Sequence, residues 1–179
     1  ASAARPVVGN ERWVMLLCRT PESAVVVSNP VAHYAKVWGN AEPGMDHYWR
    51  AVSYGQYSVS GSKLFGWYSL PKPGAAYWAL ESNGGYALNR KNVSEDCSAA
   101  ADKDVYFPDY AGIVFVVPIP ANLGNFVWAY GGSIALNHDG GIRPYRVAYM
   151  PREIGHDPEG DMAFIPQNLL AHEMGHGLG

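Results

Sequence analysis

The residues with the clearest chemical role lie at the end of the chain, in the sequence AHEMGHGLG at 171–179. His172 and His176 are four positions apart, and residues with this spacing lie one turn apart on the same face of an α-helix. Two imidazoles placed in this way can bind one metal ion, and Zn²⁺ is a usual partner of histidine ligands. Glu173 lies about 100° further round the helix, where its carboxylate can take a proton from water. The spacing therefore predicts a helical zinc site with a general base beside it.

This spacing is the HExxH motif of zinc peptidases. Gly179, three positions after His176, makes the match more specific. The alternative interpretation is a buried helix that carries two histidines without a metal. In that case the two imidazoles and the carboxylate of Glu173 would need other buried partners.

The segment HEMGHGLG resembles the first eight positions of the metzincin motif HExxHxxGxxH. More narrowly, the chain resembles the secreted immune inhibitor A-like and gametolysin-like metallopeptidases, from about Arg12 to Gly179. Three further stretches carry this resemblance: RWVMLLC at 12–18, PGMDHYWRAVSYGQYSVSGSKLFGWYSLP at 43–71 and YRVAYMP at 145–151. The resemblance implies a secreted zinc endopeptidase that acts on protein or peptide substrates.

The resemblance also implies an α+β fold of the zincin type. Residues 1–179 are expected to form the upper, N-terminal subdomain, a twisted mixed sheet of about five strands with packed helices and a C-terminal active-site helix. In the family motif the third zinc ligand falls three residues after Gly179, and a Met-turn follows it. The lower subdomain is therefore expected to be absent, and the missing C-terminal segment is an expected partner. His156 is an alternative third ligand, although its context is equally that of an ordinary loop histidine.

The composition predicts one folded domain. The chain has 179 residues, of which 48% are hydrophobic and 16% charged, enough to bury a sizeable core. A net charge of −3 does not favour binding to a polyanion, so no nucleic-acid partner is expected. No apolar run approaches the ~20 residues that cross a membrane. A basic and apolar signal peptide is not seen at the start of the sequence.

Hydrophobic runs and breakers predict a single unit of mixed strands and helices. Residues 1–11 are expected to form an extended arm, and the aromatic, Gly-rich residues 75–92 a surface excursion. Helices are expected at 30–38, 45–52, 95–104 with Ser94 as a cap, and 166–178. Strands are expected at 12–18, 56–70 (bent, or a hairpin), 112–117, 131–137 and 145–150.

The segment 131–137, GGSIALN, is the candidate edge strand for pairing with an extended peptide substrate. This expectation comes from its position before the active-site helix in similar enzymes.

The two cysteines, Cys18 and Cys97, are too far apart in sequence for a CxxC redox or zinc motif. A long-range disulfide between them is expected, mainly because the similar enzymes are secreted. Two buried free thiols are the alternative.

Calcium is a second candidate cofactor. Asp157, Glu159 and Asp161 alternate in HDPEGD, and alternating carboxylates can gather on one Ca²⁺, although a solvated acidic loop has the same composition. A weaker version of this pattern involves Asp102, Asp104 and Asp109. The remaining histidines are expected to be ordinary helix or loop residues: His33, His47 and His138.

Two non-enzymatic alternatives stay open. In the first, the chain is a cut or truncated, catalytically inert module that binds a protein partner. In the second, it is a lectin-like domain whose aromatic residues bind carbohydrate. The Trp and Tyr residues are dispersed through expected helices and strands, which favours a packing role for them.

Overall fold

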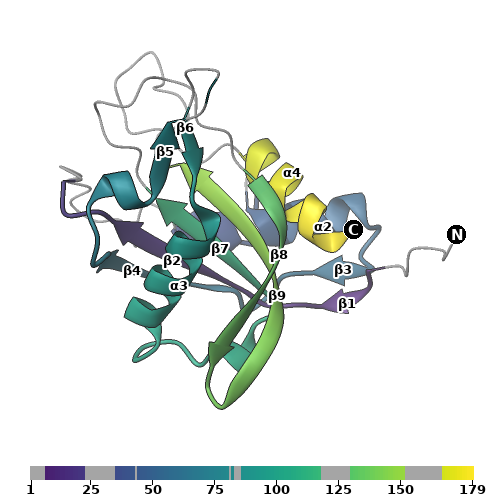
Figure 1. Cartoon of the computed structure of the whole chain (residues 1–179). Helices are drawn as coiled ribbons and strands as arrows, with labels where there is room; N and C mark the ends of the chain where they lie inside the picture. Colours follow the sequence, from purple (N-terminus) through teal and green to yellow (C-terminus); the bar gives the residue numbers. More distant parts are fainter. Residues whose placement is uncertain are drawn as a thin grey trace, which may run out of the picture.

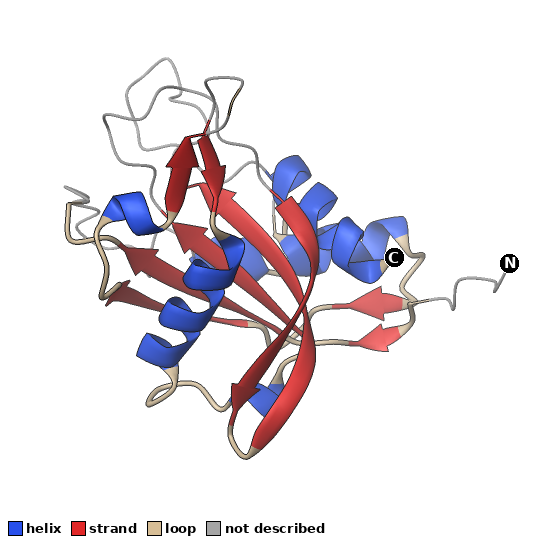
Figure 2. Ribbon diagram, in the orientation of Figure 1, coloured by secondary structure: helices blue, strands red, loops and turns tan. Residues whose placement is uncertain are grey.

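The computed structural model of this protein describes residues 7–22, 35–42, 44–80, 82, 86–117, 130–151 and 167–179. These residues form an α+β fold with one five-stranded mixed sheet and two two-stranded sheets, as expected from the sequence (Figures 1 and 2). Within the described residues, none of the helices has the length and apolar character to span a membrane.

The central sheet combines parallel and antiparallel pairing. Four of its strands are parallel, and β8 runs antiparallel to its neighbour β9 at one edge. The prediction that 131–137 is an edge strand is therefore confirmed for the described part of the chain. The strands lie in the order β4 (Lys63–Ser69), β2 (Trp13–Arg19), β7 (Gly112–Val117), β9 (Gly141–Pro151) and β8 (Tyr130–His138).

Helices cover both faces of this sheet, with α3 (Arg90–Ala101) on one face and α2 (Met45–Val52) and α4 (Gln167–Leu178) on the other (Figure 1). Alternate residues of a strand point to opposite faces. On β2, Val14 and Leu16 therefore pack with α3, whereas Met15 and Leu17 pack on the side of α4. Because both faces are covered, β2 and β7 are nearly continuous apolar runs, as in other buried parallel sheets.

The N-terminal arm is partly ordered by pairing, which corrects the expectation of a free extension over 1–11. Strand β1 (Gly9–Asn10) pairs in parallel with β3 (Tyr57–Ser58). Residues 1–6 lie outside the described residues. This pairing brings Glu11 into the folded body of the domain, where the Glu11 amide donates to the carbonyl of Ser58 at 3.0 Å.

The segment 56–70 is bent, and it is not a hairpin. Its two strands, β3 and β4, belong to different sheets. The pairing of β4 with β2 shifts in register between Leu17 and Cys18, opposite Gly66. Gly66 has a φ of 121°, and a Cβ there would lie 2.3 Å from the carbonyl oxygen of Leu17. A glycine is required at this bend because another side chain would meet backbone.

Helix α3 corrects the expected helix at 95–104, since it begins five residues earlier and ends at Ala101. The side chain of Asn89 accepts a hydrogen bond from the Asn92 amide, so Asn89 is the N-cap. Ser94, the expected cap, is instead buried inside the helix, with its hydroxyl 2.6 Å from that of Tyr149. The side chains of Asn89 and Ser94 can both cap a helix. The helix starts after Asn89 because Val93 and Cys97 then pack in the core.

The aromatic segment 75–92 contributes to the core, which corrects its expected role as a surface excursion. Tyr77 and Trp78 are buried against the α3 face of the sheet. The segment begins within a 3-10 turn, η2 (Gly74–Ala76), and contains a small antiparallel sheet of β5 (Trp78–Leu80) and β6 (Tyr86–Leu88).

Two other 3-10 turns lie elsewhere in the described residues. They are η1 (Ala35–Trp38), within the helix expected at 30–38, and η3 (Phe107–Asp109).

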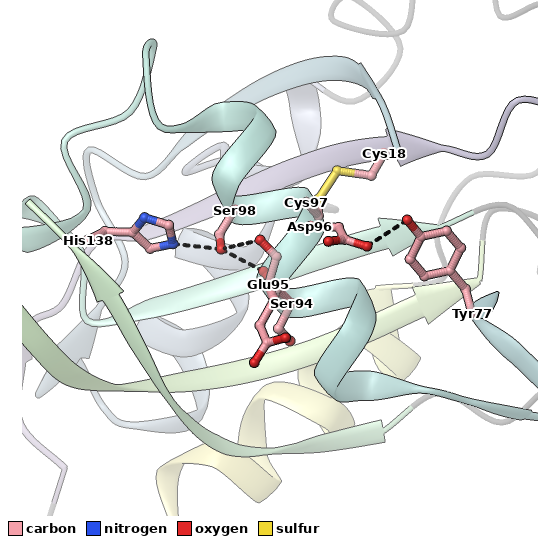
Figure 3. Close-up of a disulfide and its surroundings, with 8 residues drawn as sticks. All are labelled: Cys18, Tyr77, Ser94, Glu95, Asp96, Cys97, Ser98 and His138. Carbon is pink, nitrogen blue, oxygen red and sulfur yellow. Dashed lines mark hydrogen bonds between the residues drawn. A yellow bond between two sulfur atoms is a disulfide. The ribbon is translucent and has the colours of Figure 1, made fainter. Parts of the chain in front are cut away.

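The expected disulfide between Cys18 and Cys97 is confirmed (Figure 3). Their Cα atoms are 6.0 Å apart, the sequence separation is 79 residues, and both side chains are fully buried. The bridge joins the end of β2 to the third turn of α3. It therefore fastens the α3 layer to the centre of the sheet.

Removing this disulfide should lower the free energy of unfolding. The chain-entropy model gives ~4 kcal/mol for a loop of this size. We expect a Cys18→Ala/Cys97→Ala variant to unfold at a lower guanidinium concentration than the oxidised wild type. Its unfolding midpoint should be close to the midpoint of the reduced wild type. Equal midpoints for the oxidised wild type and the variant would contradict a stabilising role.

Candidate metal centre

Helix α4 carries the HExxH motif, and its apolar side fixes its orientation on the sheet. Leu170, Ala171 and Met174 are buried in the core cluster that includes residues of α2. His172 and His176 are exposed on a different side of the helix. The core-facing residues and the two histidines therefore lie on different sides of α4.

The two imidazoles converge. Their Nε2 atoms are 3.1 Å apart, and the rings are nearly perpendicular, with centroids separated by 4.7 Å. Two ligands of one tetrahedral Zn²⁺, each about 2.0–2.1 Å from the metal, are about 3.4 Å apart. The separation of His172 and His176 thus fits a pair of ligands for one ion, after a small outward adjustment.

Glu173 combines burial with an unused carboxylate. The residue is only 5% exposed, although it neighbours an exposed histidine. Among the described residues, none forms a hydrogen bond or ion pair with its side chain. The carboxylate is therefore not committed to a structural contact within the described part of the chain. The arrangement places an acceptor for protons on the helix that carries both histidines.

Glycines allow α4 to lie directly against β8 and β9. A Cβ at Gly131 would be 1.8 Å from the carbonyl oxygen of Glu173 and 2.8 Å from Cβ of His176. A Cβ at Gly177 would be 3.1 Å from the carbonyl oxygen of Gly132. Helix and edge strand are therefore in backbone contact at the motif itself, which leaves no room for a side chain at position 131.

The last turn of α4 is held by a polar network. Arg146 donates from Nε to the carbonyl oxygen of Gly177 at 3.1 Å and also forms a short ion pair with Glu11. The same oxygen of Glu11 accepts a hydrogen bond from the Tyr57 hydroxyl at 3.3 Å. Trp13 Nε1 in turn donates to the Tyr57 oxygen at 3.3 Å. Sequence reasoning missed this network, because its members are far apart along the chain.

Several expected sites cannot be placed. The calcium candidates and the alternative zinc ligand lie outside the described residues, as does one of the remaining histidines: Asp157, Glu159, Asp161, His156 and His33. His47 lies on α2. In the part of the chain that the structure describes, no group of three or more His, Cys, Asp or Glu residues is arranged to hold a metal ion.

The weaker acidic pattern does not form one site, because its three members have separate partners. Asp102 faces His138, Asp104 accepts from the hydroxyl of Tyr68 at 2.9 Å, and Asp109 lies 3.6 Å from Arg12.

Ser98, His138 and Asp102 have the residue types and contacts of a hydrolytic triad, which sequence reasoning did not find (Figure 3 shows Ser98 and His138). His138 Nε2 is 2.7 Å from Ser98 Oγ, and Nδ1 is 3.0 Å from Asp102 Oδ1. However, Ser98 is fully buried, and its hydroxyl donates to the carbonyl of Ser94. The serine proton is therefore directed away from the imidazole. This cluster joins the end of β8 to α3 and is not a nucleophilic site.

Asp46 is a second polar residue that sequence reasoning missed. It is 2% exposed at the start of α2. Its Oδ1 accepts from the Val59 amide at 2.9 Å, and its Oδ2 accepts from Arg50 Nε at 2.9 Å. Oδ1 thus holds α2 to the chain that follows β3, and Oδ2 forms an ion pair within α2, so Asp46 has a structural role.

Comparison with known proteins does not assign a family: no protein-family model matches the chain, and no curated protein matches it. The functional argument therefore depends on the geometry of α4 and its surroundings.

The close contact at Gly131 predicts that adding a methyl group at this position destabilises the fold. We expect Gly131→Ala to push α4 away from β8 and lower the free energy of unfolding by about 2 kcal/mol or more. Gly175→Ala is the matched control, since a Cβ there meets nothing within 4 Å and alanine favours a helix. It should be neutral or stabilising. Denaturant unfolding of both variants tests this, and an equal effect of the two would refute the contact.

The Tyr57 hydroxyl predicts a loss of stability at alkaline pH. Burial raises the pKa of Tyr57 to about 12, whereas the unfolded chain releases this proton near pH 10. The Tyr57 hydroxyl therefore makes its full contribution to the free energy of unfolding below pH 10, and this contribution is lost as the pH rises toward 12. In this range the free energy of unfolding of Tyr57→Phe should fall less steeply than that of the wild type. Tyr54→Phe, at a residue that is 92% exposed, should leave the slope unchanged.

Proposed function

We propose that this chain is the metal-binding part of a secreted zinc-dependent endopeptidase catalytic domain. The observation that carries the proposal is the convergence of His172 and His176 beside Glu173, whose side chain has no partner among the described residues. Two converging histidines and a neighbouring glutamate on one helix match the requirements of metal-assisted hydrolysis better than those of a structural helix.

The roles of the three residues follow from their chemistry. His172 and His176 would hold a zinc ion through their ring nitrogens. When bound, zinc acts as a Lewis acid that acidifies water and polarises the carbonyl of the scissile peptide bond. Glu173 accepts the proton of the attacking water and then donates it to the nitrogen of the leaving amine.

The outer edge of β8 is the proposed binding surface for an extended peptide. No strand among the described residues pairs with this edge. Gly131, near the start of β8, touches α4 at Glu173 and His176. A peptide that adds to this edge through backbone hydrogen bonds would therefore pass beside the motif.

The third zinc ligand is proposed to follow Gly179, in the segment that would also provide the Met-turn. The support for this proposal is the resemblance of HEMGHGLG to the longer metzincin motif, in which the third ligand comes three residues after this glycine.

Secretion is supported by the disulfide, because such bridges persist in oxidising compartments. The alternative, an inert module that binds a protein or carbohydrate, would give no role to the side chain of Glu173, which has no partner among the described residues. Its aromatic argument is weakened because large aromatic residues such as Trp13, Tyr57, Tyr77, Phe107 and Phe115 are fully buried.

The central test is Glu173→Gln in the full-length natural protein. The amide keeps the shape of the side chain but cannot accept a proton from water. We expect the variant to retain zinc, measured by elemental analysis, and to lose a factor of roughly 10²–10⁴ in kcat on casein. The activity of the wild type should be abolished by a chelator and restored by Zn²⁺.

Glu95→Gln is the matched control, since Glu95 is exposed on α3 and its only described ion pair, with Lys91, is 4.0 Å long. This variant should have wild-type kcat. Unchanged turnover in Glu173→Gln, or a wild-type protein without zinc and without hydrolysis, would reject the proposed function.

A further inference from the structure

The C-terminal turn of α4 is anchored from the sheet by one side chain. Arg146, on β9, donates from Nε to the Gly177 carbonyl at 3.1 Å. Its Cβ lies 3.2 Å from the position that a Cβ of Gly177 would occupy. This hydrogen bond ties the last described turn of α4 to strand β9, and a guanidinium that donates to a helix carbonyl favours an ordered turn at that point.

Glu11 holds this guanidinium in place. It pairs with Nη1 of Arg146, and the two side chains are 27% and 28% exposed, respectively. The Tyr57 hydroxyl also donates to the paired carboxylate oxygen. Glu11 itself is positioned by the strand pairing of the N-terminal segment, because β1 adds to β3 immediately before it. Arg146 is thus oriented by a residue 135 positions away in sequence.

His176 is the residue directly before Gly177, whereas His172 lies one turn earlier, nearer the middle of α4. A change in the last turn would therefore move one imidazole relative to the other. This effect acts on the geometry of a metal site and leaves its chemistry unaltered.

We propose that Arg146 is a positioning residue of the metal centre and that Glu11 acts through it. The N-terminal segment thereby becomes a working part of the site, although it contributes no ligand. This inference rests on the proposed zinc site for its effect on metal affinity. Its effect on the order of the helix end is independent of any metal.

The test uses the full-length natural protein and three variants. Arg146→Met keeps an aliphatic side chain and removes the guanidinium, and Glu11→Gln removes the ion pair. Arg143→Gln is the matched control, because Arg143 lies on the same strand and is exposed. Hydrogen exchange of residues 174–179 in the metal-free protein measures helix order. Competition with a chromophoric chelator measures zinc affinity, and the absorption spectrum of the Co²⁺ form reports ligand geometry.

We expect Arg146→Met to speed exchange at 174–179 selectively, to weaken zinc binding about 10-fold and to change the Co²⁺ spectrum. Glu11→Gln should show the same changes to a smaller degree, and the double variant should match Arg146→Met because Glu11 acts through Arg146. Arg143→Gln should leave all three measurements unchanged.

Unaltered exchange at 174–179 in Arg146→Met and Glu11→Gln would overturn the inference, as would equal zinc affinity in these variants and the wild type. If Arg146→Met does not fold, Glu11→Gln decides the question. Failure of the proposed function is distinguishable, since the wild type would then bind no zinc while the exchange measurement still tests the helix anchor.

Discussion

The backbone contact between α4 and β8 is the constraint on which the rest of the site depends. A helix normally stands off a sheet by the thickness of its side chains, but Gly131 removes that spacing at Glu173 and His176. The carbonyl of Glu173 is then held against the edge strand β8. The buried apolar side of α4, with Leu170 and Met174, supplies the packing that keeps this contact closed.

Much of the fold could be predicted from local patterns in the sequence. The apolar run at 112–117 and the helix at 45–52 have the predicted boundaries, since buried strands and a Gly-flanked helix leave strong local signals. The turn at Asp139–Gly140, with positive φ at both residues, also has a recognisable sequence for a tight hairpin. The start of α3 could not be predicted, because Asn89 and Ser94 are both good caps and only packing against the sheet selects between them.

The candidate site also has one part that local sequence patterns predict and another part that they do not. The HExxH spacing identifies His172, Glu173 and His176 without a structure, because the helix repeat alone brings them together. The ion pair of Arg146 with Glu11 has no local pattern, since it depends on the register of β1, β2, β7 and β9. The cluster of Ser98, His138 and Asp102 shows the reverse difficulty: its contacts resemble those of a catalytic triad, yet complete burial of the serine excludes the chemistry. Accessibility, which no spacing rule contains, decides between the two clusters.

The span of the Arg146–Glu11 pair has a consequence for the order of folding. Contacts between distant residues form late, because closing a long loop costs entropy before any contact is gained. The helix end at Gly177 requires β9 to be seated in the sheet and the N-terminal segment to be paired with β3. A nascent or partly folded chain would thus carry the histidine motif on an unanchored helix. The relative placement of the two histidines would then be completed only at a late stage of domain assembly.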